Sequence, residues 1–244
     1  MDKKKIINIS IFAVILIAGI VFRLLYLHTD IWYDEACSWF TAKQSFPMGT
    51  MDNLLHLDLQ HTPLYFFLLH FWIKLFGDSE VAMRTLSLLF GIGTLPLVYG
   101  ATKKITNNKI ALFSLAISAV SPLLVLFSAE VRMYPMVVFL VVLSLNFLID
   151  FEQTKSTKSL VKLVITNLLI PYTLVGGILY NVALWGTYAP YLYSQNKKDF
   201  FKYIKGLGAE IVGLIPYFIL ISYYAKMRSV FVISHEGELA FFHI

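Results

Sequence analysis

Charged residues are scarce in this 244-residue chain. Aspartate, glutamate, lysine and arginine make up 14% of the sequence, whereas hydrophobic residues make up 58%. A soluble domain of average composition is about 25% charged, because its surface faces water. So few charges cannot cover a soluble surface of this size. The composition therefore excludes an ordinary soluble domain and indicates that lipid covers much of the protein.

The chain also lacks the signatures of several kinds of site. Its single cysteine, Cys37, excludes an internal disulfide and a cysteine-based metal site. Gly91 and Gly93 lie inside an apolar run with no strand before them, so they do not form a nucleotide-binding loop. The net charge is +5, but the lysines form short clusters between apolar runs, which is typical of membrane topology. We therefore expect no nucleic-acid partner.

Seven apolar runs are long enough to cross a membrane as helices. Each is close to the ~20 residues that a hydrocarbon core ~30 Å thick requires. The sequence thus predicts an all-α polytopic membrane protein: a single membrane domain (1–244) with about seven transmembrane helices and an external tail (225–244). The predicted spans are 6–27, 81–101, 110–127, 133–149, 160–176, 178–193 and 207–224.

The lysines predict the orientation of these spans. The apolar segment 64–76 is short for a span and contains His70 and Lys74, which is typical of an interfacial helix. If this segment does not span, all four lysine clusters fall on one side, as the positive-inside rule requires. We therefore expect a multi-pass protein of the cytoplasmic membrane with its amino terminus inside. Segment 28–80 is then an external loop with juxtamembrane helices, among them 34–43 and 64–76.

Two groups of candidate reactive side chains lie in this external loop. One is near its start, and the other is just before its interfacial helix. Asp34 and Glu35 follow the first span among aromatic residues. Partial burial could raise the pKa of one carboxyl group to suit a general base, or Asp34 could simply cap a helix. His61 precedes the segment 64–76, where it could bind a phosphate or a metal ion, or lie solvated at a helix start.

A third group lies between the third and fourth spans, and a single arginine forms a fourth. Glu130, Arg132 and Tyr134 are near the bilayer boundary. A charge at mid-membrane costs roughly 2.5–3.5 kcal/mol and less near the interface, so such residues tend to face a partner or a polar cavity. Alternatively, this is an interfacial turn from which Arg132 extends to the headgroups. Arg84, at the outer end of the second span, could likewise anchor its helix at the interface.

Together, the order and spacing of these motifs resemble the integral-membrane glycosyltransferases of the C-type superfamily. The resemblance is to the branch of protein O-mannosyltransferases and lipid A aminoarabinose transferases, and it extends from about residue 6 to residue 150. The matching motifs are Asp34-Glu35 with Ser38, His61-Thr62-Pro63-Leu64-Tyr65, Ala82-Met83-Arg84 with Leu86-Ser87, and Ser128-Ala129-Glu130-Val131-Arg132-Met133-Tyr134.

This resemblance implies a transferase that moves a sugar from a polyprenyl-phosphate-linked donor, held in membrane lipid, to an acceptor hydroxyl at the outer face, with inversion. It implies that Asp34 is the general base with Glu35 in support, and that Glu130 is a second acidic site residue. A divalent metal ion is an optional cofactor on this analogy, with Asp34, His61 and Glu130 as candidate ligands. The implied donor-binding residues are His61, Arg84, Arg132 and Tyr134.

Two other hypotheses stay open. A transporter or flippase would need polar residues near mid-membrane, and the predicted spans are almost free of them. Relatives in this superfamily usually have nine or more spans, so a chain with seven could instead be an inactive, truncated fragment. The sequence identifies neither the sugar nor the acceptor.

Overall fold

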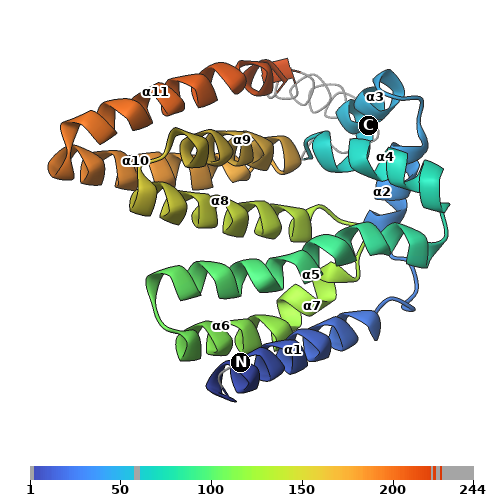
Figure 1. Cartoon of the computed structure of the whole chain (residues 1–244). Helices are drawn as coiled ribbons and strands as arrows, with labels where there is room; N and C mark the ends of the chain where they lie inside the picture. Colours follow the sequence, from blue (N-terminus) through green and yellow to red (C-terminus); the bar gives the residue numbers. More distant parts are fainter. Residues whose placement is uncertain (1–2, 58–60, 221, 224–225, 227–244) are drawn as a thin grey trace, which may run out of the picture.

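A computed structural model describes residues 3–57, 61–220, 222–223 and 226 of the chain. Over these residues the protein consists of helices and connecting segments, without strands (Figure 1). The prediction of an all-α membrane protein is confirmed. The predicted tail 225–244 lies outside the described residues except for Lys226.

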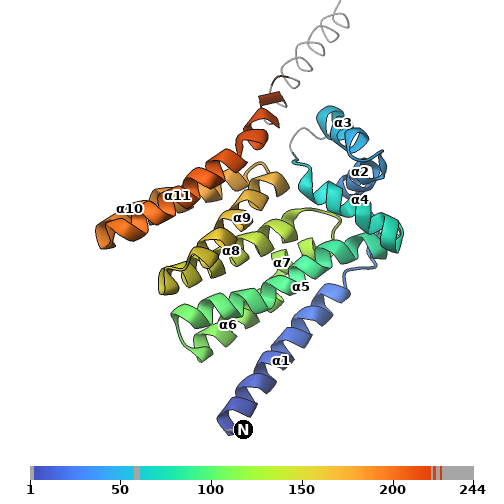
Figure 2. The ribbon, with the colours of Figure 1, turned by 45° about the horizontal axis from the view of Figure 1, so that its top comes forward.

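The described helices form a bundle with a cap at one end. Figures 1 and 2 show the long helices lying side by side, while α2, α3 and α4 gather where α1 ends and where α5 and α8 begin. The bounds of the helices are α1 (Lys3–Leu24), α2 (Tyr33–Lys43), α3 (Met48–Leu57), α4 (Leu64–Phe76), α5 (Glu80–Ile105), α6 (Asn108–Val120), α7 (Pro122–Ser128), α8 (Tyr134–Thr154), α9 (Thr157–Thr173), α10 (Gly177–Gln195) and α11 (Lys197–Gly213).

Among the described residues, some of the seven predicted spans are helices long and apolar enough to cross a membrane and others are shorter or less apolar. By length and composition, α1, α5, α8 and the stretch Lys197–Leu220 could cross a membrane, and the bent pair α6–α7 raises the number among the described residues from four to five. Helix α9 has only 17 residues, and α10 carries polar and tyrosine residues that lower its mean hydropathy. The last span begins at Lys197 rather than at Leu207, because the Asn196 side chain caps α11 by accepting from the Lys198 N–H.

The third predicted span is broken before Pro122. Helices α6 and α7 meet there at 56°, because proline has no N–H to continue the α6 ladder. The break leaves backbone carbonyls without helical partners. Arg23 of α1, 1% exposed, donates to two of them, Ala119 O at 3.1 Å and Ser118 O at 3.3 Å, and also to Ser128 Oγ at 3.2 Å. This arginine therefore ties α1 to the broken span.

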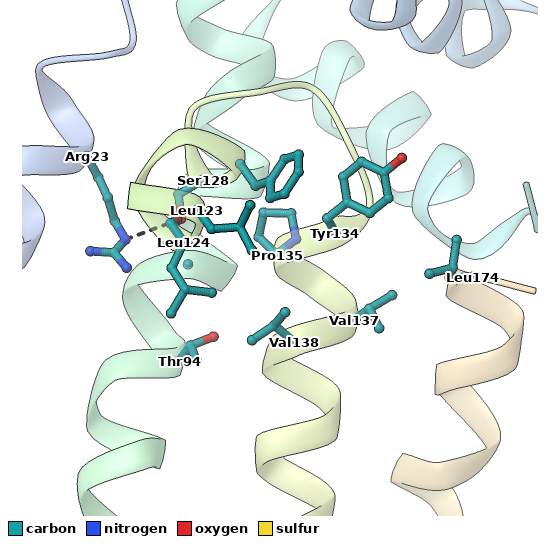
Figure 3. Close-up of a pocket in the computed structure, with 12 residues that line it drawn as sticks. Arg23, Thr94, Leu123, Leu124, Ser128, Tyr134, Pro135, Val137, Val138 and Leu174 are labelled. Atoms are coloured by element: carbon teal, nitrogen blue, oxygen red, sulfur yellow. Dashed lines mark hydrogen bonds between the residues drawn. The ribbon is translucent and has the colours of Figure 1, made fainter. Parts of the chain in front are cut away.

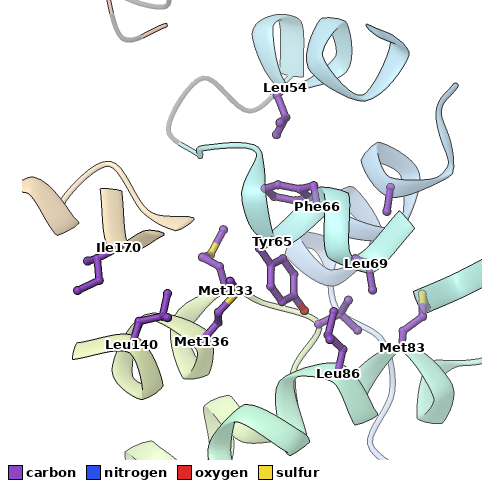
Figure 4. Close-up of a cluster of buried hydrophobic side chains, with 12 residues drawn as sticks. Leu54, Tyr65, Phe66, Leu69, Met83, Leu86, Met133, Met136, Leu140 and Ile170 are labelled. Carbon is purple, nitrogen blue, oxygen red and sulfur yellow. The ribbon is translucent and has the colours of Figure 1, made fainter. Parts of the chain in front are cut away.

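The main apolar core joins the cap to the bundle. Figure 4 shows side chains from α4, α5, α8 and α9 meeting beneath α3. Because α4 contributes Tyr65, Phe66 and Leu69 to this core, the segment just before α4 is held against the connection between α7 and α8. The other labelled members of the cluster are Leu54, Met83, Leu86, Met133, Met136, Leu140 and Ile170.

Candidate functional site

A fully buried ion pair lies at the junction of cap and bundle. Glu35, in the first turn of α2, and Arg84, in the second turn of α5, are 0% and 1% exposed. Arg84 Nη2 lies 2.6 Å from Glu35 Oε2, and its Nε lies 2.9 Å from Oε1. This geometry is a bidentate arginine–carboxylate pair, the strongest form of such a contact.

The same pair binds two further segments through the backbone. Arg84 Nη1 and Nη2 donate to the carbonyl oxygens of Leu27, Thr29 and Asp30, which follow α1. Glu35 Oε1 also accepts from the Val131 backbone N–H at 2.8 Å. All five N–H groups of the guanidinium thus have acceptors within the chain. Arg84, predicted to hold a substrate phosphate, is here engaged with Glu35 and the backbone.

Asp34, the neighbour of Glu35, has the opposite environment. Its side chain is 38% exposed, and Oδ2 lies 3.6 Å from Arg132 Nη2. Arg132, in the connection between α7 and α8, is only 3% exposed. Its Nη2 lies 3.1 Å from His61 Nε2 and 3.4 Å from the Tyr134 hydroxyl. The structure therefore brings together four predicted site residues from three separate segments: Asp34, His61, Arg132 and Tyr134.

A chain of hydrogen bonds positions the backbone of Arg132. The Ser87 hydroxyl of α5 donates to the Arg132 carbonyl at 2.9 Å, and the Tyr65 hydroxyl of α4 lies 2.8 Å from Ser87 Oγ. Tyr65 is 0% exposed. Tyr65 and Ser87 are part of the sequence motifs, but the sequence analysis gave them no role. A linear pattern does not show which residue of one motif contacts a residue of another.

Glu130, two residues before Arg132, has a carboxyl group whose pKa is raised. Burial is the main cause that raises the pKa of its carboxyl group, and the negative charge of Glu35 adds to it, while Arg132 and Arg84 oppose the rise. Its Oε2 is buried and has no hydrogen-bond partner among the described residues. The second acidic residue of the predicted site is thus within electrostatic reach of the other members.

The candidate site has unused hydrogen-bonding capacity. Besides Glu130 Oε2, the buried atoms Arg132 Nε and Thr62 Oγ1 have no partner in the part of the chain that the structure describes. Buried polar atoms are rarely left unpaired in folded proteins, so several at one place need an explanation. A polar ligand with phosphate and hydroxyl groups would supply both acceptors and donors here.

The predicted metal ligands do not form a recognisable ion site. Among the described residues, no group of three or more histidine, cysteine, aspartate or glutamate side chains is placed to hold a metal ion. Close to His61 Nε2 and Asp34 Oδ2 the structure has the guanidinium of Arg132, which already supplies positive charge.

An apolar cavity of about 350 Å³ adjoins this polar group. Figure 3 shows it between α1, α5, α7, α8 and the segment after α9, with Tyr134 and Pro135 on its wall and the Arg23–Ser128 hydrogen bond at its side. Tyr134 belongs to both regions, because its ring borders the cavity and its hydroxyl accepts from Arg132. A charged site thus lies beside a cavity suited to a hydrocarbon chain.

Comparison with known families identifies the family of the chain. A model of the dolichyl-phosphate-mannose-protein mannosyltransferase family matches residues 60–194, more than half of the chain. No curated protein sequence matches. The protein belongs to the dolichyl-phosphate-mannose-protein mannosyltransferase family, a family of glycosyltransferases. The match includes His61, Arg84, Glu130, Arg132 and Tyr134, whereas Asp34 and Glu35 precede it.

The buried pair should dominate the stability of this region. Replacing Arg84 by glutamine would leave the Glu35 carboxylate buried without a cation, which typically costs about 3–5 kcal/mol. We expect a correspondingly lower unfolding midpoint for the detergent-solubilised R84Q protein. The double variant E35Q/R84Q should recover part of the loss, because it removes the unpaired charge.

A matched control is the exposed pair between Lys43 and Asp78, 2.8 Å apart with both side chains 46% exposed. The Asp78→Asn change should leave the unfolding midpoint near that of the wild type, since solvent screens such pairs. Equal effects of R84Q and D78N would contradict the scaffold role of the buried pair.

Glu130 should make stability depend on pH. Because its pKa is raised in the folded protein, folding favours the protonated acid. This contribution is fully present below the ordinary glutamate pKa of about 4.3 and is lost as the pH rises through the folded value. Relative to Glu130→Gln, the wild type should lose stability from about pH 4.3 upward. Parallel pH–stability curves for the two proteins would sink this prediction.

Proposed function

We propose that this protein transfers a sugar from a polyprenyl-phosphate-linked donor to an acceptor hydroxyl at the outer membrane face, with inversion at the anomeric carbon. One observation carries the proposal: a half-exposed carboxylate, a buried arginine and a histidine meet beside an apolar cavity. The arrangement of the lysine clusters supports the outer face of the cytoplasmic membrane as the side of reaction, with the amino terminus on the cytoplasmic side.

The donor proposed here has two parts that match the two parts of the site. Its phosphate suits Arg132, whose planar guanidinium forms paired, charge-assisted hydrogen bonds with phosphate oxygens and whose Nε is unpartnered. His61, 3.1 Å from Arg132, is the second candidate for this contact. The isoprenoid chain suits the cavity, whose lining is mostly aliphatic and aromatic.

Asp34 is the best candidate for the general base. Both oxygens of Glu35 are occupied by Arg84, and Oε1 also accepts from Val131, so Glu35 cannot accept a further proton without breaking this scaffold. The Asp34 carboxylate is partly exposed and therefore accessible to an acceptor. Adjacent residues of α2 thus have different roles in this proposal: Glu35 positions the helix, and Asp34 faces the substrates.

The proposed step is a single displacement. Asp34 takes the proton of the acceptor hydroxyl as the acceptor oxygen forms a bond to the anomeric carbon. The bond from that carbon to the phosphate oxygen breaks on the opposite face, which inverts the configuration. The electron pair leaves with the polyprenyl phosphate, whose added negative charge Arg132 stabilises. In this proposal the unpartnered Glu130 Oε2 accepts a hydrogen bond from a sugar hydroxyl.

Asp34→Asn should abolish transfer without unfolding the protein. Removing a general base typically lowers the rate about 10²–10⁴-fold, and asparagine keeps the size of the side chain. The assay measures labelled mannose passing from dolichyl phosphate mannose to acceptors in native membranes, together with the unfolding midpoint of the purified variant.

The matched control for that assay is Asp78→Asn, which alters an exposed carboxylate of the same external loop and should retain activity. Undiminished transfer by the D34N protein would rule out Asp34 as the base.

Arg132→Gln should weaken binding of the donor phosphate. Charge-assisted contacts contribute about 1.5–3 kcal/mol each, so the affinity for polyprenyl phosphate should fall at least about tenfold. Binding of a fluorescent polyprenyl phosphate to the purified protein measures this without any acceptor. The same variant should bind the neutral polyprenol as the wild type does. Unchanged phosphate affinity would contradict the assignment of Arg132.

A further inference from the structure

A second buried polar cluster lies far along the chain from the proposed transfer site. It joins α8, α9, α10 and the spanning stretch that begins with α11. Glu210, 2% exposed, is at its centre, and its carboxylate accepts from Asn181 Nδ2 at 3.0 Å, Asn167 Nδ2 at 3.4 Å and Trp185 Nε1 at 3.4 Å. Asn167 Oδ1 in turn accepts from the Ser144 hydroxyl of α8.

The Glu210 carboxylate has only neutral partners. No lysine, arginine or histidine among the described residues forms an ion pair with it. The titratable groups that interact with it electrostatically are Tyr180 of α10 and Tyr203 of α11, and Tyr172 of α9 donates to Gly213 O near the end of α11. None of them carries positive charge. An uncompensated carboxylate in a membrane-spanning segment is costly.

A second, independent observation is an unpaired acceptor in the same cluster. Asn181 is 0% exposed, and its Oδ1 has no hydrogen-bond partner in the described part of the chain. The same amide group donates through Nδ2 to Glu210 Oε1 and to the Asn167 carbonyl. The unpartnered oxygen therefore belongs to the same buried amide group that hydrogen-bonds the Glu210 carboxylate.

We propose that Glu210 and Asn181 form an intramembrane binding site for a small monovalent cation, H⁺ or Na⁺. A proton on Glu210 would give an O–H group that donates to Asn181 Oδ1. A sodium ion would be shared by the Glu210 and Asn181 oxygens. Either ion neutralises the carboxylate and satisfies the unpaired amide oxygen. Because three helices supply the cluster around the carboxylate, the bound ion stabilises the packing of α11 against α9 and α10.

The test measures the thermal unfolding midpoint of the full-length protein in detergent, in the Glu130→Gln background so that Glu130 contributes no pH dependence. One titration varies Na⁺ at constant ionic strength with choline, and the other varies pH without Na⁺. At about a hundredfold excess over its dissociation constant, a bound ion should raise the midpoint by about 5 °C or more. Adding Glu210→Gln should abolish the response, since glutamine is neutral.

Two amide variants separate binding from packing. Asn181→Leu removes the unpaired oxygen and should shift the response to at least tenfold higher ion concentration. Asn146→Leu removes another buried amide, which bonds to Leu97 O and Val142 O away from Glu210, and should lower the midpoint without changing the response. Loss of the C=O infrared band of a protonated carboxyl in Glu210→Gln gives a second readout of H⁺.

The outcomes decide the proposal. A Na⁺-dependent rise that needs Glu210 assigns sodium, and a rise on acidification alone that needs Glu210 assigns the proton. Equal responses of the proteins with glutamate and glutamine at 210 would overturn the site. Sugar transfer is not part of the measurement, so the result is independent of the proposed function.

Discussion

The ion pair between Glu35 and Arg84 fixes the geometry on which the candidate site depends. Adjacent side chains of a helix point about 100° apart, so holding Glu35 inward at 0% exposure turns Asp34 toward solvent. Burying two charges is expensive, and mutual attraction offsets the cost only when further hydrogen bonds satisfy the remaining atoms. Here the backbone after α1 and the Val131 N–H provide them.

This pair also connects a part of the chain that the family model matches with a part that precedes the match. The family match begins at residue 60 and contains Arg84 and Arg132, whereas the proposed base Asp34 precedes it. Arg84 holds the α2 segment in place through Glu35, and Arg132 contacts Asp34 directly. The polar site thus forms where the cap meets the bundle, and the apolar cavity beside Tyr134 extends from it into the membrane-spanning part.

The predicted spans contribute buried polar side chains to the interior of the bundle. Four of the predicted spans contain one polar residue of this cluster each: Ser144, Asn167, Asn181 and Glu210. The fold brings them into one buried cluster. Polar residues are therefore present inside the predicted spans, as a transporter would require, whereas the family match favours sugar transfer.

The sequence by itself determined the class of the protein, because scarce charge and long apolar runs allow few folds in lipid. It also predicted the helices at 34–43 and 64–76, whose length and composition are local properties. It did not predict the break at Pro122 or the start of the last described span at Lys197, since these depend on the missing N–H of proline and on a side-chain cap. Only the tertiary structure decided that Glu35 is buried while Asp34 is partly exposed, that Arg84 pairs with Glu35, and that Asn181 bonds to Glu210. Burial and pairing depend on segments that are distant in sequence.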